Sequence, residues 1–362
     1  DYDNDGDLDI VQSGRGGGSY SARYYTNDGN GSFSGQLTLD PEPAGFGTAR
    51  FADIDGDGDM DYLQTGWING SKTKILLNDG AGNFTDHSAG FMKLSRGEIE
   101  AADFDNDGDL DILIAGEDDS DVAHTILYVN TGNANFIEVD KIGIMNVKDA
   151  SFEIGDLNGD DLLDVVIYGH LFGFYLQTRV YINQGDNKFN SIQTLPSLWG
   201  NKIQLGDLDN DGFLDLFVAD YFSTKFNNLY HNNGDGTFEK VTAAAPTLEA
   251  SPSISGAWGD YNNDGLADLF VANTENNKNS LYKNTGNGNF EKITTGAIVN
   301  DFGSSVGASW ADYDNDGDLD LFVANSGNHN NFLYQNNGDE TFTKITTGII
   351  VSDGGHSHGS AW

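Results

Sequence analysis

The sequence predicts an all-β fold made of seven similar units. Two patterns support this prediction, an aspartate-rich loop and a short hairpin, and each recurs seven times in the 362 residues. A fixed period of 50 to 53 residues is typical of repeat architectures, and these units occupy the chain from end to end. The loop has the form D-x-[DN]-x-D-G-x-x-D, with one departure from the glycine, and it starts at Asp1, Asp53, Asp103, Asp156, Asp207, Asp260 and Asp312.

The seventh repeat, residues 307–348, contains four extended segments. The first ends at Trp310, and the others are residues 319–324, 332–335 and 341–345. β-Branched and aromatic residues between Asn/Gly clusters are typical of strands, and no segment keeps a helical period of 3.6 residues over a useful length. The second segment is almost entirely apolar, as expected for a strand covered on both faces.

The hairpin pattern N-x-G-x-x-x-F lies between the third and fourth segments of each repeat. Asn and Gly tolerate the positive φ angles of a tight turn, and the Phe then returns to the core. Each repeat is therefore predicted to form a four-stranded antiparallel sheet. The seven hairpins are Asn27/Gly29/Phe33, Asn78/Gly80/Phe84, Asn130/Gly132/Phe136, Asn183/Gly185/Phe189, Asn232/Gly234/Phe238, Asn284/Gly286/Phe290 and Asn336/Gly338/Phe342.

Four-stranded sheets repeated around an axis are the blades of a β-propeller. We predict a single seven-bladed propeller over residues 1–362, as a segment of a longer chain, with repeats starting near 1, 53, 103, 156, 207, 260 and 312. The C-terminal GSAW matches GASW at Gly307–Trp310, so the last strand is expected to complete the blade that the N-terminus opens. An open solenoid is the alternative.

The aspartate loops carry the oxygen ligands of a hard cation. Positions 1, 3, 5 and 9 offer side-chain oxygens and position 7 offers its carbonyl, while the glycine at position 6 supplies a left-handed turn. Such ligands suit Ca²⁺ better than Zn²⁺ or copper, and acidic turns without a metal are the alternative. We predict up to seven Ca²⁺ ions, one per repeat, held by Asp1, Asp3, Asp5, Asp7 and Asp9; Asp53, Asp55, Asp57, Asp59 and Asp61; Asp103, Asp105, Asp107, Asp109 and Asp111; Asp156, Asn158, Asp160, Leu162 and Asp164; Asp207, Asp209, Asp211, Phe213 and Asp215; Asp260, Asn262, Asp264, Leu266 and Asp268; and Asp312, Asp314, Asp316, Asp318 and Asp320.

The seven sites are not expected to bind equally. The fourth loop has Asn158 at position 3 and Asp161 in place of the glycine, which should strain the turn. The sixth loop, with Asn262, has one ligand charge fewer, and the first depends on Asp1, whose free ammonium would lie beside the cation. These three sites are predicted to be weaker than those that start at Asp53, Asp103 and Asp312.

The composition limits the classes of partner. The formal net charge is −39, and more than half of the 57 acidic residues lie in the loops, so bound cations are needed to offset their repulsion. The 18 Lys and Arg residues form no stripe, which disfavours nucleic acid. No stretch approaches the roughly 20 apolar residues of a membrane span. There are no cysteines, whereas 22 Phe, 15 Tyr and 5 Trp indicate a real core.

The run W-x-D-Y-D-N-D-G-D-L-D-L-F-V-A-N, followed by N-x-L-Y-x-N-x-G-x-x-x-F, resembles the FG-GAP/VCBS repeats of integrin α-subunit propellers and of secreted bacterial proteins. The resemblance covers the whole chain. It implies a seven-bladed propeller, Ca²⁺ in the loops between the first and second strands, and an extracellular setting. The chain departs from the pattern at the Trp before the loop, where it has Phe51, Ala101, Ile154 and Leu205.

A ligand is expected on the face opposite the aspartate loops, because the loops between the second and third strands vary most there. Trp67, Tyr221 and Phe222 are predicted in these loops and are suited to stacking on sugar rings, unless neighbouring loops bury them. His356 and His358 form an i, i+2 pair on the innermost strand and could hold a ligand or transition metal, although polar channel lining is the plainer interpretation. The other histidines have no zinc-like spacing.

We therefore expect a bacterial extracellular or cell-surface module that binds glycan or protein ligands in adhesion. Ca²⁺ is expected to act on folding rather than on chemistry, and no catalytic residue is assigned. Two alternatives stay open. One is a polysaccharide lyase or hydrolase, and the other is a structural spacer or filament subunit that self-associates.

Overall fold

The computed structural model describes residues 1–362 except 4, 17–18, 30, 39–44, 46, 82, 140, 172–174, 197–201, 222–225, 328 and 353–355. For residues 13–16, 19–22, 36–38, 356 and 358–361 only the backbone is described. Phe222, one of the predicted sugar-stacking residues, lies outside the described part of the chain.

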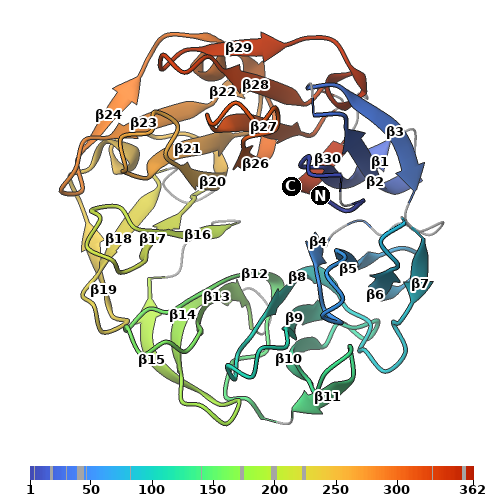
Figure 1. The fold of residues 1–362 in the computed structure, drawn as a ribbon. Coiled ribbons are helices and arrows are strands. Elements are labelled where there is room, and N and C mark those ends of the chain that lie inside the picture. Colours follow the sequence, from blue (N-terminus) through green and yellow to red (C-terminus); the bar gives the residue numbers. More distant parts are fainter. Residues whose placement is uncertain are drawn as a thin grey trace.

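Seven four-stranded antiparallel sheets surround a central axis, which confirms the predicted seven-bladed propeller (Figure 1). Each sheet is called a blade and numbered by its aspartate loop. From the axis outward the blades are blade 1, β30 (His356–Ala361), β1 (Ile10–Gly16), β2 (Ser19–Asn27) and β3 (Phe33–Thr38); blade 2, β4 (Ala49–Ala52), β5 (Asp61–Trp67), β6 (Ser71–Asn78) and β7 (Phe84–Asp86); blade 3, β8 (Ser95–Ala102), β9 (Asp111–Glu117), β10 (Ala123–Asn130) and β11 (Phe136–Val139); blade 4, β12 (Lys148–Gly155), β13 (Asp164–His170), β14 (Leu176–Asn183) and β15 (Phe189–Leu195); blade 5, β16 (Ile203–Gly206), β17 (Asp215–Val218), β18 (Asn228–Asn232) and β19 (Phe238–Val241); blade 6, β20 (Ser253–Gly259), β21 (Asp268–Asn273), β23 (Ser280–Asn284) and β24 (Phe290–Ile293); and blade 7, β26 (Ser305–Ala311), β27 (Asp320–Asn325), β28 (Phe332–Asn336) and β29 (Phe342–Ile345).

A small two-stranded sheet pairs β22 (Asn277–Lys278) with β25 (Phe302–Gly303). In the described part of the chain the helical segments are three single 3₁₀ turns, η1 (Ala245–Thr247), η2 (Ala297–Val299) and η3 (Ile349–Val351). No helix among the described residues has both the length and the apolar character that crossing a membrane requires.

The second strand of each blade is covered on both sides, as its composition predicts. Every residue of β9, β21 and β27 is buried. The apolar core of the described residues divides into seven clusters, and each cluster lies between two neighbouring blades. Stability is therefore built mainly from contacts between adjacent blades, as in other radial repeats.

Blade 1 contains strands from both ends of the chain. Strand β30 pairs antiparallel with β1, with Val11 opposite Ala361. The ring of Trp362 stacks on Tyr313 of blade 7, with centroids 6.2 Å apart and an interplanar angle of 12°. One apolar cluster joins Ile10 of β1 to Phe322 of β27. The first and seventh blades are thus packed together like any other pair.

Candidate functional site

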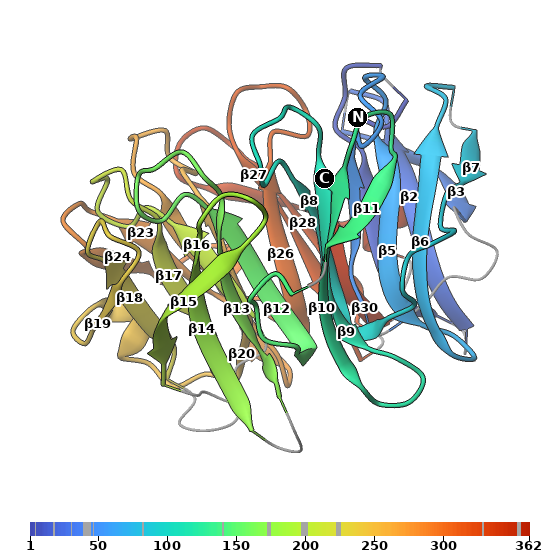
Figure 2. The ribbon, with the colours of Figure 1, turned by 90° about the horizontal axis from the view of Figure 1, so that it is seen from below.

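The aspartate loops all lie on one face of the propeller, because each follows the innermost strand and precedes the second (Figure 2). The position-1 carboxylate accepts hydrogen bonds from the main-chain N–H groups of positions 5 and 6, as Asp312 does from Asp316 and Gly317 at 3.0 and 2.9 Å. The position-5 carboxylate accepts one from the N–H of position 7. Both patterns recur in all seven loops, so the local chain fold is the same in each.

The position-9 aspartate is a buried carboxylate in every blade. In blade 2, Asp61 is fully buried and accepts hydrogen bonds from the N–H of Ile54 at 2.9 Å and of Asn78 at 2.7 Å. Burial raises the pKa of this carboxyl group to about 6, because its effect is larger than that of the two hydrogen bonds, which lower the pKa. Position 9 therefore ties the loop to the third strand. The matching residues are Asp9, Asp111, Asp164, Asp215, Asp268 and Asp320.

In four of the seven loops the position-3 aspartate has one carboxylate oxygen without a protein partner among the described residues. The Oδ1 atoms of Asp3, Asp105, Asp209 and Asp314 are buried and have no hydrogen-bond partner in the described part of the chain. A buried carboxylate oxygen without a partner is costly, and a bound cation would supply the missing interaction. The oxygens of Asp1, Asp3 and Asp5 lie within 4.8 Å of one another, and the first three aspartates of loops 2 and 5 form the same group. This donor set fits a hard cation such as Ca²⁺.

Loop 4 departs from the others in the way its sequence predicts. Asp161 adopts φ = +68° at position 6, where Gly317 has +94°, so a residue with a Cβ occupies the left-handed region. The amide of Asn158 donates to Asp160 Oδ2 at 3.0 Å, which satisfies an oxygen that would otherwise face a cation. Loop 4 therefore has fewer unsatisfied oxygens than loops 1, 3, 5 and 7.

Two of the aspartate side chains at position 7 contact a neighbouring loop. The carboxylate of Asp318 accepts a hydrogen bond from the amide of Asn263 in loop 6 at 2.7 Å. Asp7 accepts the equivalent bond from Asn315 at 2.9 Å. In these two loops the position-7 side chain joins a neighbouring loop, which leaves the main-chain carbonyl of position 7 available to a cation.

The hairpin asparagine has a second role that the sequence did not reveal. Its side-chain amide donates to the carbonyl of position 2 in the loop of the preceding blade, as Asn78 does to Tyr2 at 2.8 Å. The same amide donates to the carbonyl of position 8 in its own loop. This contact occurs in all seven blades, so the loop-bearing face carries a continuous belt of buried amides. The amide donors are Asn27, Asn78, Asn130, Asn183, Asn232, Asn284 and Asn336.

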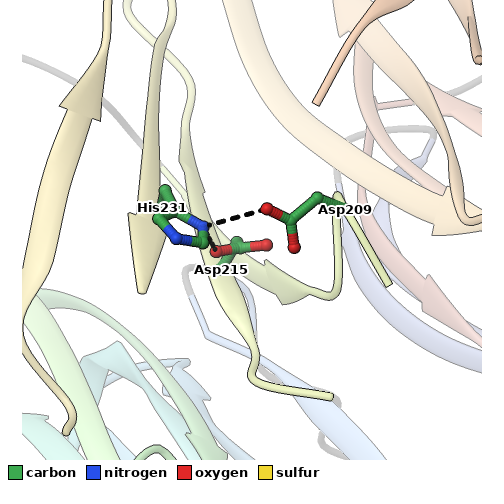
Figure 3. Close-up of side chains that lie close together, drawn as sticks. All are labelled: Asp209, Asp215 and His231. Carbon is green, nitrogen blue, oxygen red and sulfur yellow. Dashed lines mark ion pairs between the residues drawn. The ribbon is translucent and has the colours of Figure 1, made fainter. Parts of the chain in front are cut away.

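A histidine on the third strand of blade 5 lies beside loop 5, and its spacing in the sequence did not connect it with any site. The imidazole of His231, on β18, lies beside Asp209 of the loop and Asp215 of β17 (Figure 3). These residues are 6 to 22 positions apart along the chain and meet only because β17 and β18 pair.

The opposite face carries a cavity of about 810 Å³ at the mouth of the central channel, which we call the axial pocket. Its wall includes the residues at which the innermost strands bulge, since the register shifts there in blades 3, 4, 6 and 7. A bulge inserts an extra residue and re-aims its side chain. The bulged wall residues are Arg96, Asp149, Ile254 and Val306.

One side of the axial pocket is polar and fixed. Arg96 and Asp149 have left-handed φ angles of +50° and +47°, which is uncommon for such residues. They form a two-pronged ion pair with distances of 2.7 and 2.6 Å. Glu117 lies 3.4 Å from Arg96 and 2.7 Å from Lys148. Backbone strain held in place by ion pairs is typical of binding sites.

The predicted ligand residues fall in different places. Trp67 lies at the end of β5 rather than in a loop, because Ser71 pairs with it, and it lines the axial pocket. Tyr221 donates a hydrogen bond from its hydroxyl to Glu275 of blade 6 at 3.0 Å. His356 and His358 are on β30, and only their backbone is described. Among the members of this group whose side chains the structure describes, Trp67 lines the pocket and Tyr221 does not.

Deeper in the channel, carboxylates cluster around one arginine. Arg50 forms ion pairs with Glu98 and Glu100 of β8. Glu98 also accepts a hydrogen bond from the N–H of Phe152 at 2.8 Å. Burial, followed by the charges of Glu98 and Glu100, raises the pKa of Glu153 to about 8. The cluster joins β4, β8 and β12, so its contacts hold the innermost strands of three blades together.

The chain is a seven-bladed antiparallel β-propeller in which each blade has an acidic loop between its first and second strands. Comparison with family models gives a match to the FG-GAP-like repeat over residues 1–63, 103–167, 207–271, 260–323 and 312–362. The chain therefore belongs to the FG-GAP-like repeat family, and the resemblance noted in its sequence is confirmed.

Two solved structures share the fold. One is a lectin of Agrocybe aegerita that specifically recognises non-reducing terminal N-acetylglucosamine, with a TM-score of 0.64, 17% identity, and coverage of 99% of this chain and 95% of the lectin. The other is a protein from Lactobacillus plantarum, with a TM-score of 0.60, 13% identity, and coverage of 98% of each chain. No curated protein is significantly similar to this chain in sequence. At these identities the likeness concerns the fold alone.

Proposed function

We propose that this chain is a non-catalytic, glycan-binding propeller that works outside the cell and is stabilised by Ca²⁺. The observation that carries the proposal is the position of Trp67. This residue is 43% exposed and lines the axial pocket together with charged groups that an ion pair holds in place. An exposed indole at a cavity wall offers a flat apolar surface that the C–H face of a sugar ring can cover.

The other walls support the same class of ligand. Arg96 and Asp149 present donors and acceptors whose orientation is set by their ion pair, so little side-chain entropy is lost when they bind sugar hydroxyls. Ile254 and Val306 add apolar surface on the far side. A concave site with mostly apolar walls and a few oriented polar groups is the usual form of a small-ligand site.

The lectin with this fold also supports a glycan over a protein ligand, although only through its architecture. A protein partner would be expected to use a larger and flatter apolar surface than this pocket offers. The pocket lies on the face without aspartate loops, so ligand binding and cation binding are separated in space.

The calcium part of the proposal rests on the orphaned oxygens at position 3 and on the seven identical loop folds. Extracellular calcium modules work with dissociation constants of about 10⁻⁴ to 10⁻³ M, so millimolar Ca²⁺ outside the cell would fill even modest sites. FG-GAP-like repeats are typical of extracellular proteins, which supports the same location.

The test is a glycan and polysaccharide panel probed with the wild-type chain and with Trp67→Ala, in millimolar Ca²⁺. We expect the wild type to bind and Trp67→Ala to lose at least about tenfold in affinity, since truncation of an aromatic anchor in a binding site costs about 2 kcal/mol or more. Tyr175→Ala is the control, because Tyr175 is an aromatic residue that is 78% exposed and does not line the pocket.

Three outcomes would count against the proposal. An empty panel would reject the glycan class, and equal losses in the two variants would reject the axial pocket. New reducing or unsaturated ends in the bound polysaccharide would show that the protein is a hydrolase or lyase and not a non-catalytic binding module.

A further inference from the structure

The cation loop of blade 5 differs from the other six in its third strand. The residue just before the hairpin asparagine is His231, whereas blades 6 and 7 have Lys283 and Gln335 there. In blade 7 the amide of Gln335 donates to Oδ2 of Asp314, the position-3 aspartate. The side chain at this position of the third strand therefore points into the aspartate loop, and in blade 5 that side chain is an imidazole.

Three donor atoms converge in blade 5 (Figure 3). His231 Nδ1 lies 3.3 Å from Asp209 Oδ2 and 3.2 Å from Asp215 Oδ1. Asp215 is fully buried, while about a third of the His231 side chain and a quarter of the Asp209 side chain are exposed. Asp215 is thus a rigid ligand, whereas the other two side chains are open to solvent. An incoming ion can therefore reach the group.

His231 Nδ1 lies within ion-pair distance of both carboxylates, but neither contact has the geometry of a hydrogen bond. Nδ1 of His231 and Oδ1 of Asp209 are buried atoms without a hydrogen-bond partner among the described residues. Metal–ligand bonds of about 2.0–2.2 Å at tetrahedral angles separate neighbouring donors by about 3.3–3.6 Å. The observed spacing of 3.2 and 3.3 Å is therefore close to that of a coordination shell.

The ligand types decide which cation fits. Ca²⁺ takes oxygen ligands almost exclusively, so an imidazole nitrogen in place of an oxygen weakens its binding. One imidazole and two carboxylates suit Zn²⁺ and neighbouring divalent transition metals, which accept mixed nitrogen and oxygen ligands. Three protein ligands leave a further coordination position for water.

We propose that Asp209, Asp215 and His231 form a transition-metal site that binds Zn²⁺. The predicted cation ligands in the other loops are oxygen atoms. The position-3 aspartate is shared, since Asp209 also groups with Asp207 and Asp211 of the loop. A transition metal held by the imidazole competes with Ca²⁺ for Asp209, and blade 5 binds one or the other.

The test uses Co²⁺ as a spectroscopic substitute for Zn²⁺, titrated into the whole chain in excess Ca²⁺. We expect one equivalent to bind with a visible absorption band and to be displaced by one equivalent of Zn²⁺. His231→Gln, which copies the amide of blade 7, should lose the band and weaken Zn²⁺ binding by roughly 100-fold. The metal content after dialysis gives the stoichiometry independently.

A reciprocal variant keeps the proposal testable if His231→Gln folds poorly. Gln335→His places the same imidazole beside Asp314 and Asp320 in blade 7, and we expect it to bind a second equivalent of Co²⁺. The proposal is overturned if the wild type keeps no Co²⁺ in excess Ca²⁺, or if His231→Gln binds it as tightly as the wild type. A melting temperature in Ca²⁺ equal to that of the wild type would show that each variant is folded.

Discussion

The side-chain amide of Asn27 donates a 2.6 Å hydrogen bond to the main-chain carbonyl of Tyr313, which lies 286 residues further along the chain. The same amide donates to the carbonyl of Leu8 in its own loop at 3.1 Å. Asn27 is buried, so water does not replace these two hydrogen bonds while the blades stay packed. This contact joins blade 1 to blade 7 in the way that six other asparagines join the remaining pairs.

Asn27→Asp is therefore expected to destabilise the fold strongly. The change keeps the shape but replaces two donors with a carboxylate that faces two carbonyl oxygens in a buried site. Leaving a buried charge without a partner costs about 3–5 kcal/mol. Urea unfolding in millimolar Ca²⁺ would measure the loss.

Asn337→Asp is the matched control, because Asn337 is exposed and its amide donates only to Thr341 Oγ1 in the same hairpin. We expect a change of less than about 0.5 kcal/mol there. Similar losses for the two variants would mean that the amide belt contributes little to holding the blades together.

Removal of Ca²⁺ is expected to lower the melting temperature by a large margin, because the clustered carboxylates of the loops would repel one another without it. A site filled at 100 times its dissociation constant adds about 2.7 kcal/mol to the free energy of unfolding. The measurement is a thermal melt in Ca²⁺ and in EGTA, and an unchanged melting temperature would contradict the calcium proposal.

Single loops can then be compared by calorimetric Ca²⁺ titration. Asp105→Ala removes the orphaned oxygen of loop 3 and should lose one binding equivalent. Asn158→Ala should change the titration little, because loop 4, with Asn158 at position 3 and Asp161 in place of the glycine, is predicted to be a weak site before the change. Equal losses in the two variants would show that loop 4 binds as well as loop 3.

The sequence was sufficient for the repeated elements and insufficient for what lies between them. Each loop and hairpin is a local pattern, so the left-handed backbone at Gly317 and Asp161 follows from their position in the loop motif. The bulges at Arg96 and Asp149 could not be foreseen, because one extra residue in a strand leaves no signal in composition or period. The axial pocket depends on those bulges.

The partners of the hairpin asparagines and of His231 were missed for a different reason. The acceptor of Asn78 is the main-chain carbonyl of Tyr2, which any residue type could supply. His231 meets Asp209 only after strands pair, and a single histidine without a regular spacing does not indicate a site. Both contacts depend on tertiary geometry that the repeat pattern does not encode.

Glu153 is expected to make stability depend on pH. Its pKa of about 8 lies far above the ordinary carboxyl value of about 4.3, so the folded state holds this proton more tightly than the unfolded state. The resulting stabilisation is complete below about pH 4, declines as the pH rises, and is lost once the pH passes about 8. Above about pH 8 the buried side chain is charged in the folded state, and this charge weighs against folding.

Glu153→Gln should remove this dependence, since Gln204 can still donate to the Oε1 atom at position 153, as it does now at 2.7 Å. We expect the melting temperature of the variant to rise relative to the wild type between pH 5 and pH 8. Glu239→Gln, at an exposed position on β19, serves as the control. Parallel pH profiles for wild type and Glu153→Gln would contradict the expectation.

The packing of blade 6 against blade 7 depends on a glycine beneath a tryptophan. A Cβ added to Gly259 would lie 2.7 Å from ring atoms of Trp310, closer than real carbon contacts allow. The indole N–H of Trp310 also donates to the carbonyl of Ala257 at 3.2 Å, so the ring cannot simply move away. Gly259→Ala should therefore cost about 1–3 kcal/mol, as overpacked cores do.

A double-mutant cycle can separate this clash from other effects of the substitution. Trp310→Leu alone should be destabilising because it leaves a cavity, but in that background Gly259→Ala should cost much less than in the wild type. Urea unfolding of the four proteins gives the coupling energy directly. Additive effects would mean that the close approach of Gly259 and Trp310 does not set the spacing of these two blades.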